Sequence, residues 1–360
     1  MINSLKFENF RIFPEMEITP LKRINLIAGA NNTGKTGILE GLFLLFASDG
    51  PHSARIPSVF RSPTSRDPHL GRHTPDDFTT FWQTLFYDRR TEAPARADAR
   101  TEKGDWASCR FEFGAAFHIQ IGYETLGKDR KLIPEPGHPL GAPVSMGRPK
   151  PWPVAFSISS NGGSAPQEPN PFAKRLIVSS TRSANPFQDA DLYHEVSLKK
   201  GAEEKLRELL IETDPRLEKL QDATWPGTSG PLVYTHFGLG NALCINQAGQ
   251  GFSRLFSLFC QMLVSKAQIL LIDEIENGLY YETMPQIWKG LAALAASENI
   301  QIFATTHSRE CIISAHETMK TMPEYDFALH RLQRVNGRLE SVTHDREMLE
   351  AAFDSAMDVR

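Results

Sequence analysis

Three short apolar runs along the chain predict buried strands. Residues 24–28 read INLIA, residues 269–272 read ILLI and residues 300–304 read IQIFA. Runs of four or five apolar residues that end at glycine or polar positions are typical of strands buried on both faces of a parallel sheet. An apolar helical pattern over residues 37–47 follows the first run after a glycine-rich segment. These runs predict an α/β fold around a parallel sheet.

Two further segments have clear periodicity. Residues 108–122 alternate between apolar and polar positions, which predicts two strands of an antiparallel sheet. Residues 199–221 are amphipathic at helical spacing, with Leu206, Leu209 and Leu210 on one face until Pro215 interrupts the pattern. We expect this helix to pack on a sheet. The predicted fold class is α/β, with a mixed parallel sheet, an antiparallel β subdomain and a helical lobe.

The proline distribution divides the chain. Residues 51–171 hold 16 of the 24 prolines, and proline is excluded from helix interiors and central strands. We therefore expect the main domain to comprise residues 1–47 and 174–360, with the strands near 108–122 packed on it. Residues 48–105 and 125–173 are expected to be proline-rich insertions or loops.

Composition and charge narrow the function classes. The 360 residues are 41% hydrophobic and 23% charged, which is ordinary for a globular protein. A net charge of -4 excludes a polycation that coats nucleic acid. The longest apolar run, residues 42–47, is far shorter than the roughly 20 residues of a membrane span. The start of the chain does not resemble a signal peptide, and the four cysteines form no CxxC pair. We expect a cytoplasmic protein that does not bind membranes.

The segment between the first strand and its helix matches a phosphate-binding loop. Residues 29–36 read GANNTGKT, which fits G-x-x-x-x-G-K-[ST] at every fixed position. In such a loop, backbone N–H groups at a helix N-terminus bind the β-phosphate. Lys35 would bridge the β- and γ-phosphates, and the Thr36 hydroxyl would ligate Mg2+. The predicted nucleotide-binding residues also include Gly29, Asn31, Asn32, Thr33, Gly34 and Gly37.

Acidic residues end the second predicted strand. Asp273 and Glu274 follow ILLI directly, and ligands of open α/β sheets bind at the carboxyl ends of strands. We expect Asp273 to hold the magnesium shell and Glu274 to polarise an attacking water. His307 follows the third strand and is expected to sense the γ-phosphate. These residues together predict ATP binding and hydrolysis, with ATP and Mg2+ as ligands.

A second glycine-rich segment, residues 247–251 (QAGQG), precedes a helical pattern over residues 255–264. Glycines that open a helix form an anion-binding N-terminus, although this signal alone is weak. The segment ends 22 residues before Asp273, and this position strengthens its interpretation as an anion-binding helix N-terminus.

The order of these motifs resembles that of an ABC-type ATPase head of the P-loop NTPase class. The start, LKFENFR at residues 5–11, and GANNTGKT followed by ILEGL are similar to the RecF, SMC and OLD group. Within it, the chain most resembles OLD-like AAA ATPases of bacteria, including those that act in anti-phage defence. Residues 325–360 resemble the strand and terminal helix that finish such a head.

The resemblance implies that two heads close face to face around two ATP molecules, as a homodimer or a higher even-numbered assembly. Glu274 would be the catalytic base and His307 would lie at the γ-phosphate. Asn277 would lie at the dimer seam, and Arg11 would approach the phosphates. The Lys35 loop of one subunit would face the signature segment of the other.

That signature segment departs from the family pattern. The predicted trans-acting residues are Ala248, Gly249, Gln250 and Gly251. Ala248 replaces the serine whose hydroxyl meets the γ-phosphate, so backbone amides are expected to bear that contact. No glutamine can be assigned to a Q-loop, and Gln83 is a candidate only by elimination.

We expect no Toprim nuclease domain like that of OLD nucleases, because only about 50 residues follow His307. The resemblance therefore implies a separate effector, such as a nuclease or a toxin, under the control of a regulatory ATPase.

Two alternatives stay open. One is a RecF-like repair ATPase that binds DNA through four arginines of a predicted loop, Arg55, Arg61, Arg66 and Arg72. The other is a nucleotide-dependent scaffold with little hydrolysis.

Overall fold

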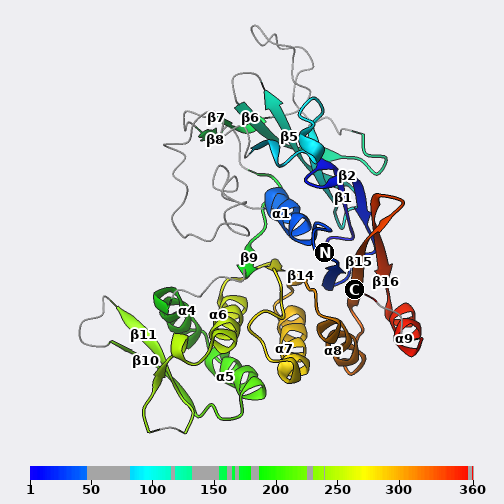
Figure 1. Cartoon of the computed structure of the whole chain (residues 1–360). Helices are drawn as coiled ribbons and strands as arrows, with labels where there is room; N and C mark the ends of the chain where they lie inside the picture. The colour runs from blue at the N-terminus through cyan, green and yellow to red at the C-terminus, as the bar shows by residue number, and fades with distance from the viewer. Residues whose placement is uncertain are drawn as a thin grey trace. The chain divides into compact units, whose positions relative to one another are not determined.

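The computed structural model describes residues 1–46, 82–114, 118–131, 154–159, 164–166, 170–179, 186–224, 230–238, 240–355 and 359. The chain divides into two compact units. Unit 1 comprises Met1–Leu21, Ala30–Lys174 and Leu332–Thr343. Unit 2 comprises Lys22–Gly29, Arg175–Arg331 and His344–Arg360. Figure 1 shows the elements of both units along the chain.

Unit 1 contains a seven-stranded antiparallel sheet in the order β2-β1-β4-β5-β6-β7-β8. Its elements are β1 (Ser4–Phe10), β2 (Phe13–Ile18), α1 (Lys35–Phe46), η2 (Tyr87–Arg89), β4 (Ala95–Arg100), β5 (Trp106–Gly114), β6 (His118–Leu126), β7 (Val154–Ser159) and β8 (Ser164–Pro166). The predicted antiparallel pair at 108–122 is confirmed as β5 and β6. The expectation of loops at 48–105 and 125–173 missed β4, β7 and β8, which are six, six and three residues long.

Helix α1, which follows the phosphate-binding loop, is fixed at its middle and at its end. A Cβ atom at Gly41 would lie 2.3 Å from the Phe7 ring, so only glycine allows this approach to β1. The last carbonyl groups of a helix lack partners within it. In α1 they accept hydrogen bonds from the Tyr123 hydroxyl, the Asn170 amide and the Lys174 backbone N–H. These contacts hold the helix that carries the loop.

Unit 2 is built on a sheet in the order β16-β15-β3-β14-β13-β9. Its strands are β3 (Ile24–Gly29), β9 (Leu176–Ser179), β13 (Ile269–Ile272), β14 (Gln301–Thr305), β15 (Phe327–Val335) and β16 (Arg338–His344), and the unit boundary falls inside β15 and β16. Strands β3, β14, β13 and the edge strand β9 are parallel. The three strands that the apolar runs predicted are therefore confirmed, as is the predicted parallel sheet.

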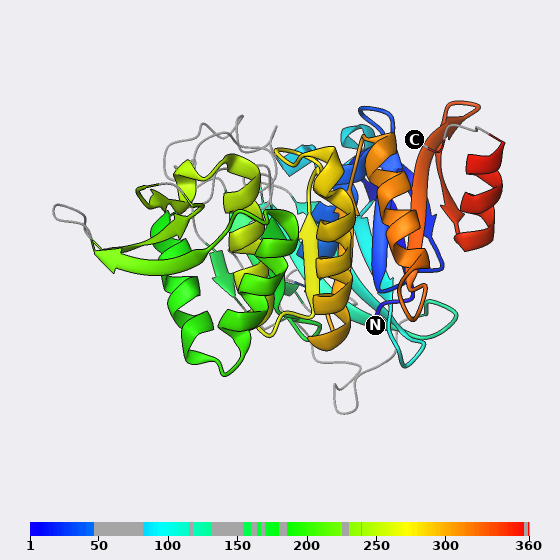
Figure 2. The ribbon, with the colours of Figure 1, turned by 90° about the horizontal axis from the view of Figure 1, so that it is seen from below.

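The helices of unit 2 are α4 (Pro186–Leu198), α5 (Ala202–Thr213), α6 (Gln250–Val264), α7 (Met284–Ser297), α8 (Arg309–Lys320) and α9 (Arg346–Asp354). Two 3-10 turns, η3 (Ile245–Gln247) and η4 (Tyr281–Thr283), and a small antiparallel sheet, β10 (Lys219–Thr224), β11 (Pro231–His236) and β12 (Leu243–Cys244), complete the unit. Figure 2 shows α6, α7 and α8 side by side.

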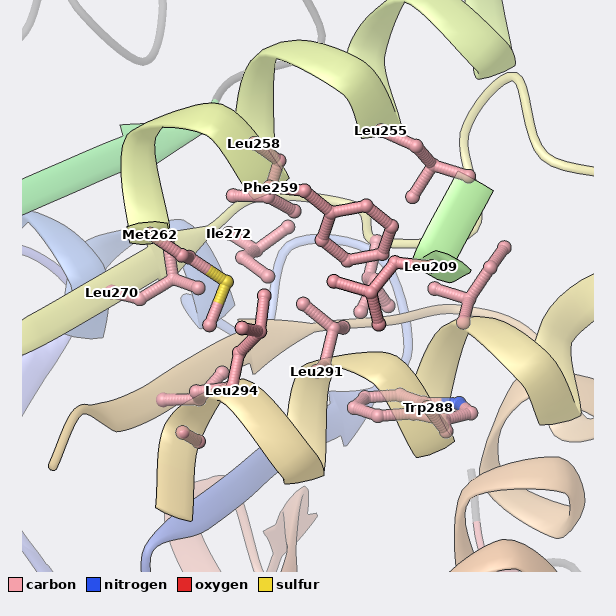
Figure 3. Close-up of a cluster of buried hydrophobic side chains, with 14 of the residues drawn as sticks. Leu209, Leu255, Leu258, Phe259, Met262, Leu270, Ile272, Trp288, Leu291 and Leu294 are labelled. Carbon is pink, nitrogen blue, oxygen red and sulfur yellow. The ribbon is translucent and has the colours of Figure 1, made fainter. Parts of the chain in front are cut away.

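The core of unit 2 joins three helices to one strand. Figure 3 shows Leu209 of α5 among side chains of α6, β13 and α7, including Phe259, Ile272 and Leu291. A Cβ at Gly290 of α7 would lie 3.0 Å from Leu209. The amphipathic helix was therefore predicted correctly, but the expectation that it packs on a sheet is wrong. It packs on α6 and α7, which cover its apolar face.

One buried carboxyl in this unit makes stability depend on pH. Asp189 of α4 is 1% exposed and bonds to the Ser257 hydroxyl. Burial raises its pKa from 3.8 to about 6, which outweighs the opposite effect of that hydrogen bond. The folded chain therefore binds the proton more tightly than the unfolded chain. This contribution to stability is complete below pH 3.8 and is lost as the pH rises through 6.

Asp189→Asn, which is neutral at every pH, is expected to raise the free energy of unfolding by up to ~3 kcal/mol above pH 7. The advantage should shrink steadily between pH 7 and pH 5 in thermal unfolding. Asp214→Asn is the control, because the Arg216 side chain lowers the pKa of Asp214, so its effect should be constant over this range. A constant effect of Asp189→Asn would contradict the prediction.

Candidate nucleotide-binding site

The glycine loop has the backbone that a phosphate-binding loop requires. Strand β3 ends at Gly29, and α1 begins at Lys35. Gly34 has a φ of +89°, and a Cβ there would lie 2.6 Å from the Phe13 ring. Asn32 also has a positive φ. The predicted succession of strand, glycine loop and helix is thus present, and the loop leads directly into the N-terminus of α1.

Inside the loop, Lys35 bonds back to the chain. Its Nζ atom donates to the carbonyl oxygen of Ala30 at 2.9 Å, and the Thr33 hydroxyl donates to the same oxygen at 2.8 Å. The Lys35 residue is only 6% exposed. An ammonium group bonds more strongly to a phosphate oxygen than to a neutral carbonyl. The buried ammonium, the helix N-terminus and the positive-φ glycine therefore fit a phosphate group.

Arg11 lies in the turn between β1 and β2. Its Nε atom is 2.8 Å from the Glu40 carboxylate of α1, and its Nη1 atom donates to the Thr84 carbonyl and hydroxyl. Both charged side chains of this ion pair are buried. The ion pair therefore anchors the β1–β2 turn to the helix behind the loop. No role was predicted for Glu40 from the sequence, and the contact of Arg11 with phosphates stays a prediction.

The acidic residues lie at the carboxyl ends of neighbouring parallel strands. Ile272 of β13 pairs with Ala304 of β14, so the next residues, Asp273 and Thr305, meet at this edge. The Thr305 hydroxyl donates to the Asp273 carboxylate at 2.7 Å and accepts the Glu274 N–H at 2.8 Å. Asp273 is only 8% exposed. A buried carboxylate held in place at a strand end is suited to ligate a hard cation.

Glu274 and His307 meet at the same edge. Glu274 has a φ of +47°, and its side chain is 43% exposed. The His307 Nε2 atom lies 3.7 Å from its carboxylate. The backbone N–H of His307 donates to the Glu276 carboxylate at 2.7 Å. The structure therefore brings together the two acids and the histidine that the sequence singled out.

The strand that leads into the glycine loop ends at this edge too. Strand β3 is the parallel neighbour of β14, with Ile27 opposite Thr305, and Thr306 N–H donates to the Ile27 carbonyl. Because β3, β14 and β13 run in one direction, Gly29 lies at the edge that carries Asp273.

The segment at residues 247–251 opens α6, which begins at Gln250 rather than at the predicted residue 255. Gly249 is the N-cap, with a φ of +104°. A Cβ at Gly251 would lie 2.1 Å from the carbonyl oxygen of Gly278, so α6 starts directly against the turn that follows the acids. The exposed Asn277 lies in that turn. The trans-acting roles of residues 248–251 and the seam role of Asn277 stay predictions.

Arg254 fixes α6 to the turn after β13. Its guanidinium donates to the carbonyl oxygens of Asp273, Glu274 and Asn277 at 2.8 to 3.0 Å, and to the Ser179 hydroxyl at 3.4 Å. Burial lowers the pKa of Arg254, and the nearby carboxylates oppose this effect. No role was predicted for Arg254 from the sequence, because an arginine near the start of a helix is common.

Thr36 and Asp273 are the predicted magnesium ligands, a hydroxyl and a carboxylate. Such hard oxygen donors fit Mg2+, which typically binds one or two protein groups beside the phosphates of a nucleotide. The residues described by the structure contain no group of three or more His, Cys, Asp or Glu that could hold a metal ion by themselves.

Two further sequence expectations concern surfaces. The four arginines at positions 55, 61, 66 and 72 lie outside the described residues. Among the helices of the described residues, none is long and apolar enough to cross a membrane.

Comparisons with known proteins identify related ATPase domains. A family model described as "AAA domain, putative AbiEii toxin, Type IV TA system" matches residues 122–312, more than half of the chain. A second AAA domain model matches residues 4–90. An ATP/GTP phosphatase of Helicobacter pylori is 22% identical over 354 residues, which cover 91% of this chain and 90% of that protein. The DNA replication and repair protein RecF of Idiomarina loihiensis is 43% identical over 44 residues, 12% of each chain.

Solved structures show the fold. The SMC head bound to the C-terminal winged-helix domain of ScpA matches with a TM-score of 0.50 at 12% identity, over 97% of this chain and 99% of that chain. An SMC head from Pyrococcus furiosus with an extended coiled coil, bound to the C-terminal domain of ScpA, has the same TM-score at 10% identity, over 99% of both chains. The predicted ABC-type ATPase head of the P-loop NTPase class is therefore confirmed.

Proposed function

Because the chain belongs to the family described as "AAA domain, putative AbiEii toxin, Type IV TA system", we propose that it is the regulatory ATPase of an OLD-like bacterial defence system. It is a P-loop ATPase with an ABC-type head. In the proposed role it forms ATP-sandwich dimers in the cytoplasm and controls a separate effector, such as a nuclease or a toxin. The observation that carries the ATPase assignment is the meeting of Asp273, Glu274 and His307 at the strand edge where Gly29 lies.

In the proposed mechanism, the Lys35 loop binds the phosphates through its backbone N–H groups and the lysine ammonium. Thr36 and Asp273 would hold Mg2+, which would supply positive charge beside the phosphate oxygens. Glu274 accepts a proton from the attacking water, and its exposed carboxylate is accessible for this role. The His307 imidazole, which lies beside that carboxylate, donates to the γ-phosphate.

In the proposed dimer, the start of α6 meets the nucleotide of the partner subunit. The N–H groups of its first turn have no partners within the helix, so they are suited to an anion. Ala248 has no hydroxyl to offer, which is why the backbone of Gly249, Gln250 and Gly251 takes this contact. Asn277 lies in the turn against which α6 begins, and is exposed for a contact across the seam.

The proposed defence role is supported by the family description, which names a putative toxin and a type IV toxin–antitoxin system. Phage plating on cells that carry the gene with its native neighbours tests the defence role. The wild type should lower plating efficiency, and Lys35→Ala should restore it. Equal phage plating efficiency with the wild type and with Lys35→Ala, at equal protein levels, would contradict the defence role and leave the ATPase assignment intact.

A RecF-like role in DNA repair is the second candidate, favoured by the local similarity to RecF. It requires direct DNA binding, through Arg55, Arg61, Arg66 and Arg72. Such binding should weaken steeply as salt rises, because counterions are released from phosphates. Replacing all four arginines by glutamate should then abolish it, and unchanged DNA affinity would rule out these residues. A scaffold with little hydrolysis would instead show turnover near zero that Glu274→Gln cannot lower.

A further inference from the structure

We infer that Thr305 is a positioning residue that holds Asp273 and Glu274 in their separate roles during ATP hydrolysis. The inference rests on the proposed function, in which Asp273 ligates Mg2+ and Glu274 receives a proton. These two acids are adjacent in the chain, and the Thr305 hydroxyl contacts both residues.

The direction of the hydrogen bonds is unambiguous. The backbone N–H of Glu274 can only donate, so the Thr305 hydroxyl oxygen is its acceptor, at 2.8 Å. The hydroxyl hydrogen is then available for the Asp273 carboxylate, which lies 2.7 Å away. A single hydroxyl thus joins the backbone of the proton acceptor to the side chain of the metal ligand.

The same residue also fixes the chain beyond the acids. The carbonyl oxygen of Thr305 accepts the N–H of Ile275 at 3.0 Å. Between these two bonds lies Glu274, whose φ of +47° is unfavourable for a residue with a side chain. Arg254 supports this conformation from the other side, through the Glu274 carbonyl. The direction of the Glu274 carboxylate therefore depends on contacts that Thr305 makes on one side.

Packing alone does not account for a threonine at this position. Thr305 is 1% exposed and ends a strand whose five residues are all buried. Valine has almost the same shape and suits a buried strand at least as well. The hydroxyl is costly to bury unless it is hydrogen-bonded, and both of its bonds described above go to the acidic pair. The hydrogen bonds to Asp273 and Glu274 therefore explain why position 305 carries a hydroxyl.

A comparison of Thr305→Val with Thr305→Ser separates the effect of the hydroxyl on turnover from the effect of side-chain shape. We expect Thr305→Val to lower kcat for ATP by roughly 10- to 100-fold, the usual effect of removing a group that orients a metal ligand. The Mg2+ concentration needed for half-maximal ATP binding, measured by titration calorimetry, should rise, while KM for ATP at saturating Mg2+ changes little because the Lys35 loop is intact. Thr305→Ser should retain most of the turnover. Thermal unfolding of both variants reports whether the fold is kept.

A double variant tests whether Thr305 acts through Glu274. In the Glu274→Gln background, Thr305→Val should lower the remaining turnover less than it does in the wild type, because only the part of the effect that passes through Asp273 remains. If Thr305→Val does not fold, Thr305→Ala and Thr305→Ser make the same comparison with smaller side chains.

Two results would overturn the inference while the wild type remains an active ATPase. One is equal kcat for the valine and serine variants. The other is an equal fold-loss from Thr305→Val in both backgrounds together with an unchanged Mg2+ requirement. A wild type without ATP turnover would instead contradict the proposed function itself, so the two failures are distinguishable.

Discussion

Replacing Lys35 by alanine is expected to abolish ATP binding at concentrations that saturate the wild type. The ammonium of Lys35 is held inside the loop by the Ala30 carbonyl, and bound phosphates would take over this hydrogen bond. A hydrogen bond to a charged group is worth about 1.5–3 kcal/mol. Loss of two such bonds, to the β- and γ-phosphates, would weaken ATP binding by ~150-fold or more. Titration calorimetry with ATP and Mg2+ measures the loss.

Lys200→Ala is the matched control, because Lys200 is an exposed lysine next to the end of α4. It should bind ATP like the wild type. Stabilisation against thermal unfolding by ATP should likewise vanish for Lys35→Ala and persist for Lys200→Ala. ATP affinity of Lys35→Ala within a few-fold of the wild type would mean that the loop does not bind the phosphates.

Glu274→Gln is expected to lose ATP hydrolysis and retain ATP binding. Glutamine keeps the size of the side chain but cannot accept the proton of the attacking water. Removing a positioned general base typically costs ~10²- to 10⁴-fold in rate. The backbone bonds that hold residue 274 come from Thr305 and Arg254, so the substitution leaves them in place. Phosphate release and calorimetry, measured on one preparation, separate turnover from binding.

Glu282→Gln changes an exposed glutamate of η4 in the same way and should leave both properties unchanged. If Glu274→Gln hydrolyses ATP as fast as the wild type, the base is another group. If it loses ATP binding as well, Glu274 belongs to the binding site rather than to the hydrolytic step.

The central residues of the site could be predicted because their signals are local. The loop from Gly29 to Thr36 carries its pattern in eight consecutive residues, and Asp273 and Glu274 directly follow a short apolar strand. In both cases the strand end decides where the side chain lies, so sequence order is enough to place it at the ligand edge.

The supporting residues could not be predicted, because their partners are distant in the chain. Thr305 is 31 and 32 residues from the two acids that it contacts. Arg254 bonds to carbonyl groups 19 to 23 residues away. Nothing in the sequence specifies such pairs, and a threonine at a strand end or an arginine in a helix is common. Only the register of β13 on β14 brings Thr305 to the acids.

The same reasoning explains the parts of the fold that were missed. Strands β7 and β8 are short segments between prolines, without enough length for an alternating pattern to stand out. The apolar face of α5 was recognised, but periodicity shows only that a face is buried. Leu209 contacts Gly290 and Phe259, and the periodicity of residues 199–221 does not identify either partner.

The central claim, an ATP-gated sandwich of two heads, is tested most directly by the molar mass of Glu274→Gln. Light scattering should give a smaller species without nucleotide. With ATP and Mg2+ it should give a dimer, twice the 40.3 kDa of one chain, or a larger even-numbered assembly. The wild type, measured in parallel, distinguishes a constitutive assembly from a site that does not close. A variant that binds ATP but remains a monomer would contradict the account.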